Sequence, residues 1–230
     1  MTTTPPLPLR ALATDYDGTL AHNGAVNEAT LAALKRLKEA GLKLILVTGR
    51  ETNELISIFP ELTLFDLAVM ENGAVLLDPA SGEMEVLAEP PSTEFITRLL
   101  DRGIPLQVGK TIVATWEPHE TEVLLAIKEL GLELQVIFNK GAVMILPTGM
   151  NKATGLLEAL KRLEVEPSEV AGIGDAENDH AFLQLCGYSV AVANALPSIQ
   201  EKVHFVTAAD HGDGVVELID YLLASKSSES

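Results

Sequence analysis

The chain has 230 residues, of which 47% are hydrophobic and 21% charged, and its formal net charge is −17 at pH 7. This length and balance predict a packed protein with room for one large domain and a smaller one, and they exclude a disordered or fibrous chain. The negative charge repels phosphate backbones and anionic lipid, so we expect neither nucleic acid nor a membrane surface as partner.

The lone cysteine, Cys186, has no partner for an internal disulfide and favours a reducing compartment. We interpret it as a small buried residue near the end of a helix. Residues Met1 to Pro8 lack the basic and apolar segments of a leader, and no apolar run is long enough to span a bilayer. These features predict a cytoplasmic protein.

The first part of the chain alternates between strands and helices. Residues Leu9–Asp15 form an apolar run that ends in acids and Gly18, which predicts a buried strand followed by a loop. Asn27 can cap a helix that runs to Ala40, and Leu42–Thr48 is a second apolar strand. Strand, helix and strand in succession predict a parallel sheet with helices on both faces.

The middle of the chain breaks this alternation. Residues Ala74–Leu77 and Met84–Ala88 flank a Pro-Ala-Ser-Gly turn, which predicts a hairpin. Further helices and strands are expected over Ser92–Asp101, Thr111–Trp116, Pro118–Leu130 and Ala142–Leu146. Residues 79–149 are therefore predicted to form a small α+β cap domain inserted into the core. From the cap Trp116 could touch substrate, but we favour a place for it in the cap's own interior.

The alternation returns after this insertion. We expect helices at Ala153–Leu163 and Asp179–Leu185, and strands at Val170–Ile173 and Ser189–Val192. Residues 1–78 and 150–230 then form one α/β core with a doubly wound parallel sheet. In such sheets ligands bind beyond the carboxyl ends of the strands, so polar residues at those ends are the candidates for chemistry.

Four polar clusters fall at these strand ends or at the start of the helix after the insertion. They are Asp15-Tyr16-Asp17-Gly18-Thr19, Thr48-Gly49-Arg50, Lys152, and Gly174-Asp175-Ala176-Glu177-Asn178-Asp179. Two close carboxylates suit a shared cation or a shared proton. A hydroxyl and backbone N–H groups opening a helix suit an anionic oxygen, and a lysine at a helix start can reach a phosphate. Each cluster alone is also common in turns and helix caps.

In this order and with this spacing, the clusters resemble the motifs of the haloacid dehalogenase (HAD) superfamily of phosphohydrolases. The motifs carry over at Asp15, Asp17, Thr48, Lys152, Asp175 and Asp179. An insertion between Thr48 and Lys152 is similar to the cap of the Cof-type branch, subfamily IIB, and Glu71-Asn72-Gly73 is similar to that branch's Asn-Gly turn. Ala153 stands where a glycine commonly follows the lysine in that branch.

The resemblance implies a Mg²⁺-dependent phosphatase in which the Asp15 carboxylate attacks phosphorus to form an aspartyl-phosphate and Asp17 serves as general acid and base. The implied ligands of Mg²⁺ are Asp15, the carbonyl of Asp17, and Asp175. The implied phosphate-binding residues are Gly18, Thr48, Gly49 and Lys152. Arg50 and Asn72 are candidates for contact with substrate, while Asn178 and Asp179 are expected to orient the metal-bound water and Lys152.

The expected substrate is a small phosphomonoester, such as a sugar phosphate or phosphoglycolate. Only five basic residues fall within positions 79–149, spread over helices and turns, which favours a monophosphate over a bisphosphate. A phosphomutase of the same superfamily keeps both aspartates and remains an alternative. A phospho-accepting signalling or binding module is an alternative from another class, but the insertion and Asp17-Gly18-Thr19 favour the phosphatase.

Overall fold

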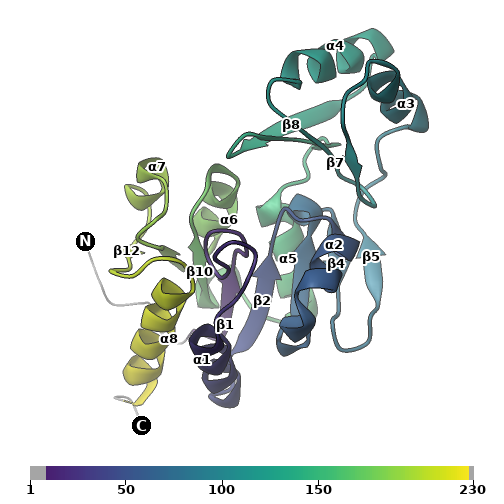
Figure 1. Ribbon diagram of the computed structural model, residues 1–230. Helices are drawn as coiled ribbons and strands as arrows, with labels where there is room; N and C mark the ends of the chain where they lie inside the picture. Colours follow the sequence, from purple (N-terminus) through teal and green to yellow (C-terminus); the bar gives the residue numbers. More distant parts are fainter. Residues whose placement is uncertain (1–8, 228–230) are drawn as a thin grey trace.

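The computed structural model describes residues 9–227 and contains two β-sheets, each with its own helices (Figure 1). The larger sheet has the strand order β12-β11-β10-β1-β2-β3-β4-β5. Its strands are β1 (Ala11–Thr14), β2 (Lys43–Val47), β3 (Leu67–Met70), β4 (Val75–Leu77), β5 (Met84–Val86), β10 (Val170–Gly174), β11 (Tyr188–Ala191) and β12 (Phe205–Val206). All neighbours pair in parallel except β3 with β4 and β4 with β5.

Helices cover both faces of this sheet. They are α1 (Glu28–Glu39), α2 (Thr52–Ile58), α5 (Lys152–Leu163), α6 (His180–Leu185), α7 (Pro197–Gln200) and α8 (His211–Ser227). Helix α1 packs against α8 and helix α5 against α6, on opposite faces (Figure 1). Strands β1 and β10 are buried along their whole length because they lie between these layers, which explains their continuous apolar sequence. The predicted doubly wound α/β core is confirmed.

The chain changes direction across the sheet at β1. From β1 it proceeds outward through β2 and β3 on one side, and later through β10 and β11 on the other. Thr14 pairs with Leu46 of β2 and with Ile173 of β10, so the residues that follow these strands emerge at one edge. A reversal of strand order opens a crevice at that edge, where ligands bind in folds of this kind.

A second, four-stranded antiparallel sheet lies beside this edge with the order β6-β7-β9-β8 (Figure 1). We call residues 93–147 the cap; its elements are α3 (Thr93–Asp101), β6 (Gln107–Val108), β7 (Val113–Trp116), α4 (Glu120–Leu130), β8 (Leu134–Asn139) and β9 (Ala142–Pro147). Alternate residues of β9 serve two cores: Val143 and Ile145 pack under the cap helices, whereas Met144 and Leu146 pack toward Ala74 of the larger sheet. The cap is thus apolar on both faces of its sheet.

Some elements differ from the expectation. The hairpin at β4 and β5 forms as predicted, but β5 pairs within the larger sheet, which therefore extends to residue 86 although positions from 79 were assigned to the cap. The domain boundaries themselves stay a prediction. Cys186 is buried at the end of α6, as interpreted. None of the helices within residues 9–227 combines the length and apolar character that a membrane span requires.

Candidate active site

The carboxyl ends of β1, β2 and β10 and the start of α5 bring the four predicted clusters together. The backbone N–H of Asp15 donates to Ile173 at 3.0 Å, which joins the loop after β1 to the end of β10. Helix α5 begins at Lys152 because Asn151 and Thr154 form a capping box, so the missing glycine after the lysine does not disturb the helix start. The sequence-predicted residues therefore share one site.

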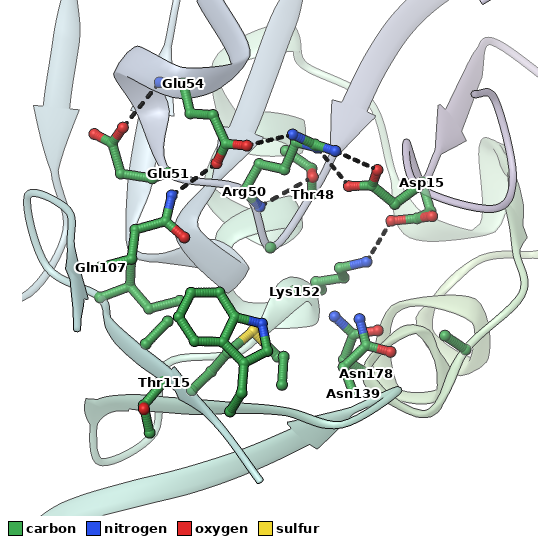
Figure 2. A pocket seen from close by; sticks show the side chains of 18 residues that line it. Asp15, Thr48, Arg50, Glu51, Glu54, Gln107, Thr115, Asn139, Lys152 and Asn178 are labelled. Atoms are coloured by element: carbon green, nitrogen blue, oxygen red, sulfur yellow. Dashed lines mark hydrogen bonds and ion pairs between the residues drawn. The ribbon is translucent and has the colours of Figure 1, made fainter. Parts of the chain in front are cut away.

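Lys152 is the centre of a buried charge cluster. Its ammonium lies 2.6 Å from Asp15 Oδ1 and 2.5 Å from Asp179 Oδ1, and Figure 2 shows it directed at Asp15. Burial raises the pKa of Asp15 well above its ordinary value, the Asp179 carboxylate raises it further, and Lys152 opposes the shift. Burial by itself lowers the pKa of Lys152, but Asp15 and Asp179 outweigh it and the net pKa is raised.

Asp179 supports the cluster with both of its oxygens. While Oδ1 receives Lys152, Oδ2 accepts the backbone N–H groups of Asp175 at 2.8 Å and Ala176 at 3.0 Å. Gly174 leaves room for this arrangement, since a Cβ there would lie 2.7 Å from Asp179 Oδ2. Asp179 thus fixes the loop that carries Asp175; its role in orienting Lys152 and the metal-bound water stays a prediction.

Asp175 is fully buried and faces two donors. Thr19 Oγ1 donates to Asp175 Oδ1 at 3.1 Å, and the ammonium of Lys140, at the tip of the β8–β9 hairpin of the cap, lies 2.5 Å from Asp175 Oδ2. Burial raises the pKa of Asp175, and the hydrogen bond from Lys140 opposes this shift. Lys140 was not predicted as a site residue because a lysine of the cap belongs to none of the motifs.

The carboxylates suit a divalent cation. Asp15, Asp175 and Asp179 each offer an oxygen within 4.8 Å of the others. Gly18, at φ +86°, keeps this space clear, since a Cβ there would collide with Asp175 Oδ2. Hard oxygen donors of this kind match Mg²⁺, and the Lys140 ammonium already places positive charge beside Asp175. The donor set therefore fits such an ion, while Mg²⁺ itself and the ligands Asp15, Asp175 and the Asp17 carbonyl stay predictions.

Arg50 connects the loop after β2 to the loop after β1. Its guanidinium donates to both carboxylate oxygens of Asp17 at 2.7 and 2.8 Å and to Glu54 at 2.6 Å, and it lies over the ring of Tyr16. The hydrogen bonds to Asp17 raise the pKa of Arg50. The Asp17 side chain is thereby held apart from the cluster of Asp15, Asp175 and Asp179.

Asn72 lies behind the cavity instead of on its wall. Its side chain is fully buried, accepts from Asn178 Nδ2 at 3.0 Å and donates to Met144 Sδ at 3.1 Å. Asn178 lines the cavity, so Asn72 reaches the site through that neighbour. Direct contact of Asn72 with substrate stays a prediction.

A cavity of about 190 Å³ opens between these core residues and the cap. Asp15, Asp17 and Lys152 line its core side, and Trp116 and Asn139 line its cap side (Figure 2 labels Asp15, Lys152 and Asn139). The placement of Trp116 in the cap interior was wrong: its side chain is 48% exposed because it follows the buried Thr115 and so points to the opposite face of β7.

Two further residues of the cavity wall, Gln107 and Asn139, were not predicted. Gln107 of the cap donates to Glu54 Oε2 at 2.7 Å and so ties the two sides together. The side-chain oxygens of Asn139 and Asn178 are buried without a hydrogen-bond partner among residues 9–227, and Figure 2 shows the two side chains next to each other. Buried oxygens of this kind are available to a bound molecule or water.

The metal site makes a testable prediction that needs no turnover. Mg²⁺ should raise the melting temperature of the wild type, because an ion that binds only the folded state stabilises it. Asp175→Asn should abolish that rise. Lys140→Met should enlarge it at the same Mg²⁺ concentration, because the ammonium no longer competes for Asp175 Oδ2. Thermal unfolding by circular dichroism checks all three, and equal shifts in wild type and Asp175→Asn would contradict the assigned site.

Buried paired carboxylates, a buried lysine and a cavity at the switch point of an α/β sheet define the class of the protein as an enzyme for a small anionic substrate. The family model of haloacid dehalogenase-like hydrolases matches residues 12–107 and 106–219. The chain belongs to this family, which confirms the resemblance and the predicted hydrolase.

Relatives and solved structures agree with this assignment. The chain is 30% identical to a phosphoglycolate phosphatase of Methanothermobacter thermautotrophicus, over 92% of this chain and 97% of that protein. It is also 30% identical to phosphoglycolate phosphatase 2 of Saccharolobus solfataricus, with coverage of 93% and 92%. A haloacid dehalogenase-like hydrolase from Bacteroides thetaiotaomicron shares the fold with a TM-score of 0.80, at 19% identity and with coverage of 94% and 100%.

Proposed function

We propose that the protein is a Mg²⁺-dependent phosphatase that hydrolyses a small phosphomonoester, with 2-phosphoglycolate as the first substrate to test, through a covalent intermediate on Asp15. The observation that carries the proposal is the position of the Asp15 carboxylate, held 2.6 Å from Lys152 at the base of the cavity and within reach of Asp175. Relatives of nearly the same length named phosphoglycolate phosphatase support the substrate class.

The size of the cavity supports a small leaving group. Its volume of about 190 Å³ lies below the range of about 300–1,000 Å³ that is common for drug-sized ligands. Its cap wall includes the apolar Ile112 and Ala114 beside polar Gln107 and Asn139. A short chain with a few polar atoms fits such a wall better than a nucleotide does.

In the proposed first step, an Asp15 carboxylate oxygen forms a bond to phosphorus while the bond between phosphorus and the leaving oxygen breaks. Lys152, the Thr48 hydroxyl and the amides of Gly18 and Gly49 offset the charge on the phosphoryl oxygens. Asp17 gives a proton to the leaving alkoxide, which departs as the alcohol. Bound Mg²⁺ supplies charge neutralisation between the carboxylates and the phosphate.

In the second step, water attacks the phosphorus of the aspartyl-phosphate and the bond to the Asp15 oxygen breaks. Asp17, now ionised, accepts a proton from that water, and inorganic phosphate leaves. Arg50 orients Asp17 for this exchange through its two hydrogen bonds. The cycle returns both aspartates to their starting states.

A screen of phosphate release tests the proposal. Purified protein with Mg²⁺ is assayed on phosphoglycolate, glycerol phosphate, sugar phosphates and a nucleoside monophosphate, with Asp15→Asn in parallel. We expect phosphate release from the smallest substrates and none from the variant. Absence of release from every compound, or dependence on a sugar bisphosphate without net release, would contradict the phosphatase. Cytoplasmic location stays a prediction.

Asp17→Asn is expected to separate the two steps. Its kcat on phosphoglycolate should fall about 10²- to 10⁴-fold, because neither the leaving group nor the water has its proton-transfer partner. With p-nitrophenyl phosphate, whose phenolate needs no proton to leave, a stoichiometric burst should precede slow turnover. Rapid-quench kinetics measure the burst, and Glu28→Gln on exposed α1 is the control. Unchanged turnover in Asp17→Asn would contradict the role.

A further inference from the structure

Glu71 carries a carboxylate that none of the steps above uses. The side chain is fully buried at the end of β3. Its oxygens accept from Thr52 Oγ1 at 2.9 Å and from three successive backbone N–H groups of the cap, those of Lys110 at 3.1 Å, Thr111 at 2.8 Å and Ile112 at 3.0 Å. Consecutive N–H groups that converge in this way form an anion-binding nest. Here the bound anion is a side chain of the core.

The core side of this contact is rigidly joined to the predicted phosphate-binding loop. The N–H of Glu71 donates to Arg50 O at 3.1 Å, and the N–H of Asn72 donates to Thr48 O at 3.0 Å. Both Glu71 and Asn72 have positive φ, 51° and 53°, a conformation that non-glycine residues adopt only where the surroundings hold them. A displacement of Glu71 therefore also displaces the loop that carries Thr48 and Arg50.

The cap side of the contact leads directly into the cavity wall. Ile112, whose N–H is bound by Glu71, precedes β7, and Ile112, Ala114 and Trp116 all line the cavity. Gly109 permits the close approach, since a Cβ there would lie 2.8 Å from the Glu71 carboxyl. The distance from Asp15 to the cap wall of the cavity therefore depends on the hydrogen bonds between Glu71 and the cap backbone.

We propose that Glu71 is the positioning residue that docks the cap and sets the height of its wall above Asp15. This inference rests on the proposed function, since it concerns the same cavity. Other contacts between cap and core within residues 9–227 include the Gln107–Glu54 and Asn72–Met144 hydrogen bonds, the Lys140–Asp175 pair and the apolar cluster around Ala74. Glu71 differs from them because it holds three backbone groups of one loop at once.

Two variants act on the contact from opposite sides. Glu71→Gln keeps the size of the side chain but replaces one accepting oxygen by an NH₂ group that faces N–H donors. Gly109→Ala leaves Glu71 intact and presses a methyl group against its carboxyl. Thr52→Val is the matched control, since it removes a donor to the same carboxylate on the core side and leaves the three cap amides in place.

Hydrogen exchange and distance measurements report on the docking without any substrate. Amides 110–112 should exchange at least about tenfold faster in Glu71→Gln and Gly109→Ala than in wild type or Thr52→Val. Spin labels at Lys35→Cys and Leu124→Cys, both exposed, should show a broader distance distribution in the same two variants. The native Cys186 is buried, and burial raises the pKa of its thiol, so it stays unlabelled.

Steady-state kinetics then test whether Glu71 positions the cap wall over the substrate. In both variants KM for the best substrate should rise and kcat/KM should fall about 10- to 100-fold. Mg²⁺ should still raise the melting temperature of both variants, because Asp15 and Asp175 are untouched. Wild-type exchange and distances in either variant would overturn the proposal. If Glu71→Gln fails to fold, Gly109→Ala alone decides, because it keeps the charge of the Glu71 carboxylate. A wild type without phosphatase activity would overturn the proposed function and leave the exchange and distance results to decide the docking.

Discussion

Asp15→Asn is expected to lower kcat for phosphate release by about 10⁴-fold or more, the scale on which removal of an attacking nucleophile acts. The amide has nearly the shape of the carboxyl but cannot form a bond to phosphorus. Malachite-green detection of phosphate measures the loss, and intact-protein mass spectrometry should detect a phosphoenzyme in wild type after rapid acid quench but not in the variant. Activity within tenfold of wild type would disprove nucleophilic attack by Asp15.

The same variant should keep its stability, which separates a chemical role from a structural one. Burial raises the pKa of Asp15 in the folded state, so ionisation of this carboxyl costs folding free energy as the pH rises through that pKa. A neutral asparagine removes the cost. In the absence of metal, Asp15→Asn should therefore melt at the same temperature as wild type or higher. Asp220→Asn, at an exposed pair with Arg36, is the control that keeps full activity.

Lys152→Met is expected to damage both activity and stability. The ammonium is 2% exposed and pairs with Asp15 and Asp179, so its removal leaves buried carboxylates without a partner. Loss of one partner from a buried pair costs about 3–5 kcal/mol. The phosphate should also lose its point-charge ligand, with a fall in kcat/KM of about 10²- to 10³-fold. Urea unfolding and phosphate release measure the two effects.

The pH dependence of this loss has a definite sign. The pKa of Lys152 is raised in the folded state, so its stabilising contribution is complete at pH values below its unfolded pKa of 10.5 and is lost only as the pH rises through the folded value. In Lys152→Met the carboxylates can take up protons as the pH falls, so the deficit should shrink toward acid pH. Lys161→Met, on the same helix in an exposed pair with Glu158, should cost under about 1 kcal/mol and retain activity.

The strands of the core could be predicted where burial leaves a continuous apolar run. Strand β1 and strand β2 are of this kind, and the expected ranges contain them. Strand β8 was not predicted because it lies at the edge of the cap sheet and is partly exposed along its length, which gives a mixed sequence. Strand β3 is apolar and buried but was not predicted, because the buried apolar residues Leu62 and Phe65 just before it obscure where the strand begins.

The residues of the candidate site also divide into those that the sequence predicts and those that only the fold brings together. Asp15, Thr48, Lys152 and Asp175 follow strands or open a helix, so local sequence together with the resemblance was enough to select them. Lys140 and Gln107 reach the site only through the placement of the cap. The partners of Glu71 in the cap lie about 40 residues away and are backbone groups, as the bond from Thr111 N at a separation of 40 shows. No side-chain pattern can report such a contact.

The use of backbone groups in the Glu71 contact affects how the amino-acid sequence of the cap can diverge during evolution. Hydrogen bonds from the backbone N–H groups of residues 110–112 to Glu71 place almost no constraint on the side chains of these residues. The exception in this loop is Gly109, where a side chain would collide with the Glu71 carboxyl. The cap is also one uninterrupted stretch of chain between β5 and α5, while the proposed reacting groups, Asp15 and Asp17, lie in a loop of the larger sheet. Substitutions can therefore accumulate over the cap and redirect substrate choice, while the chemistry beneath is inherited unchanged.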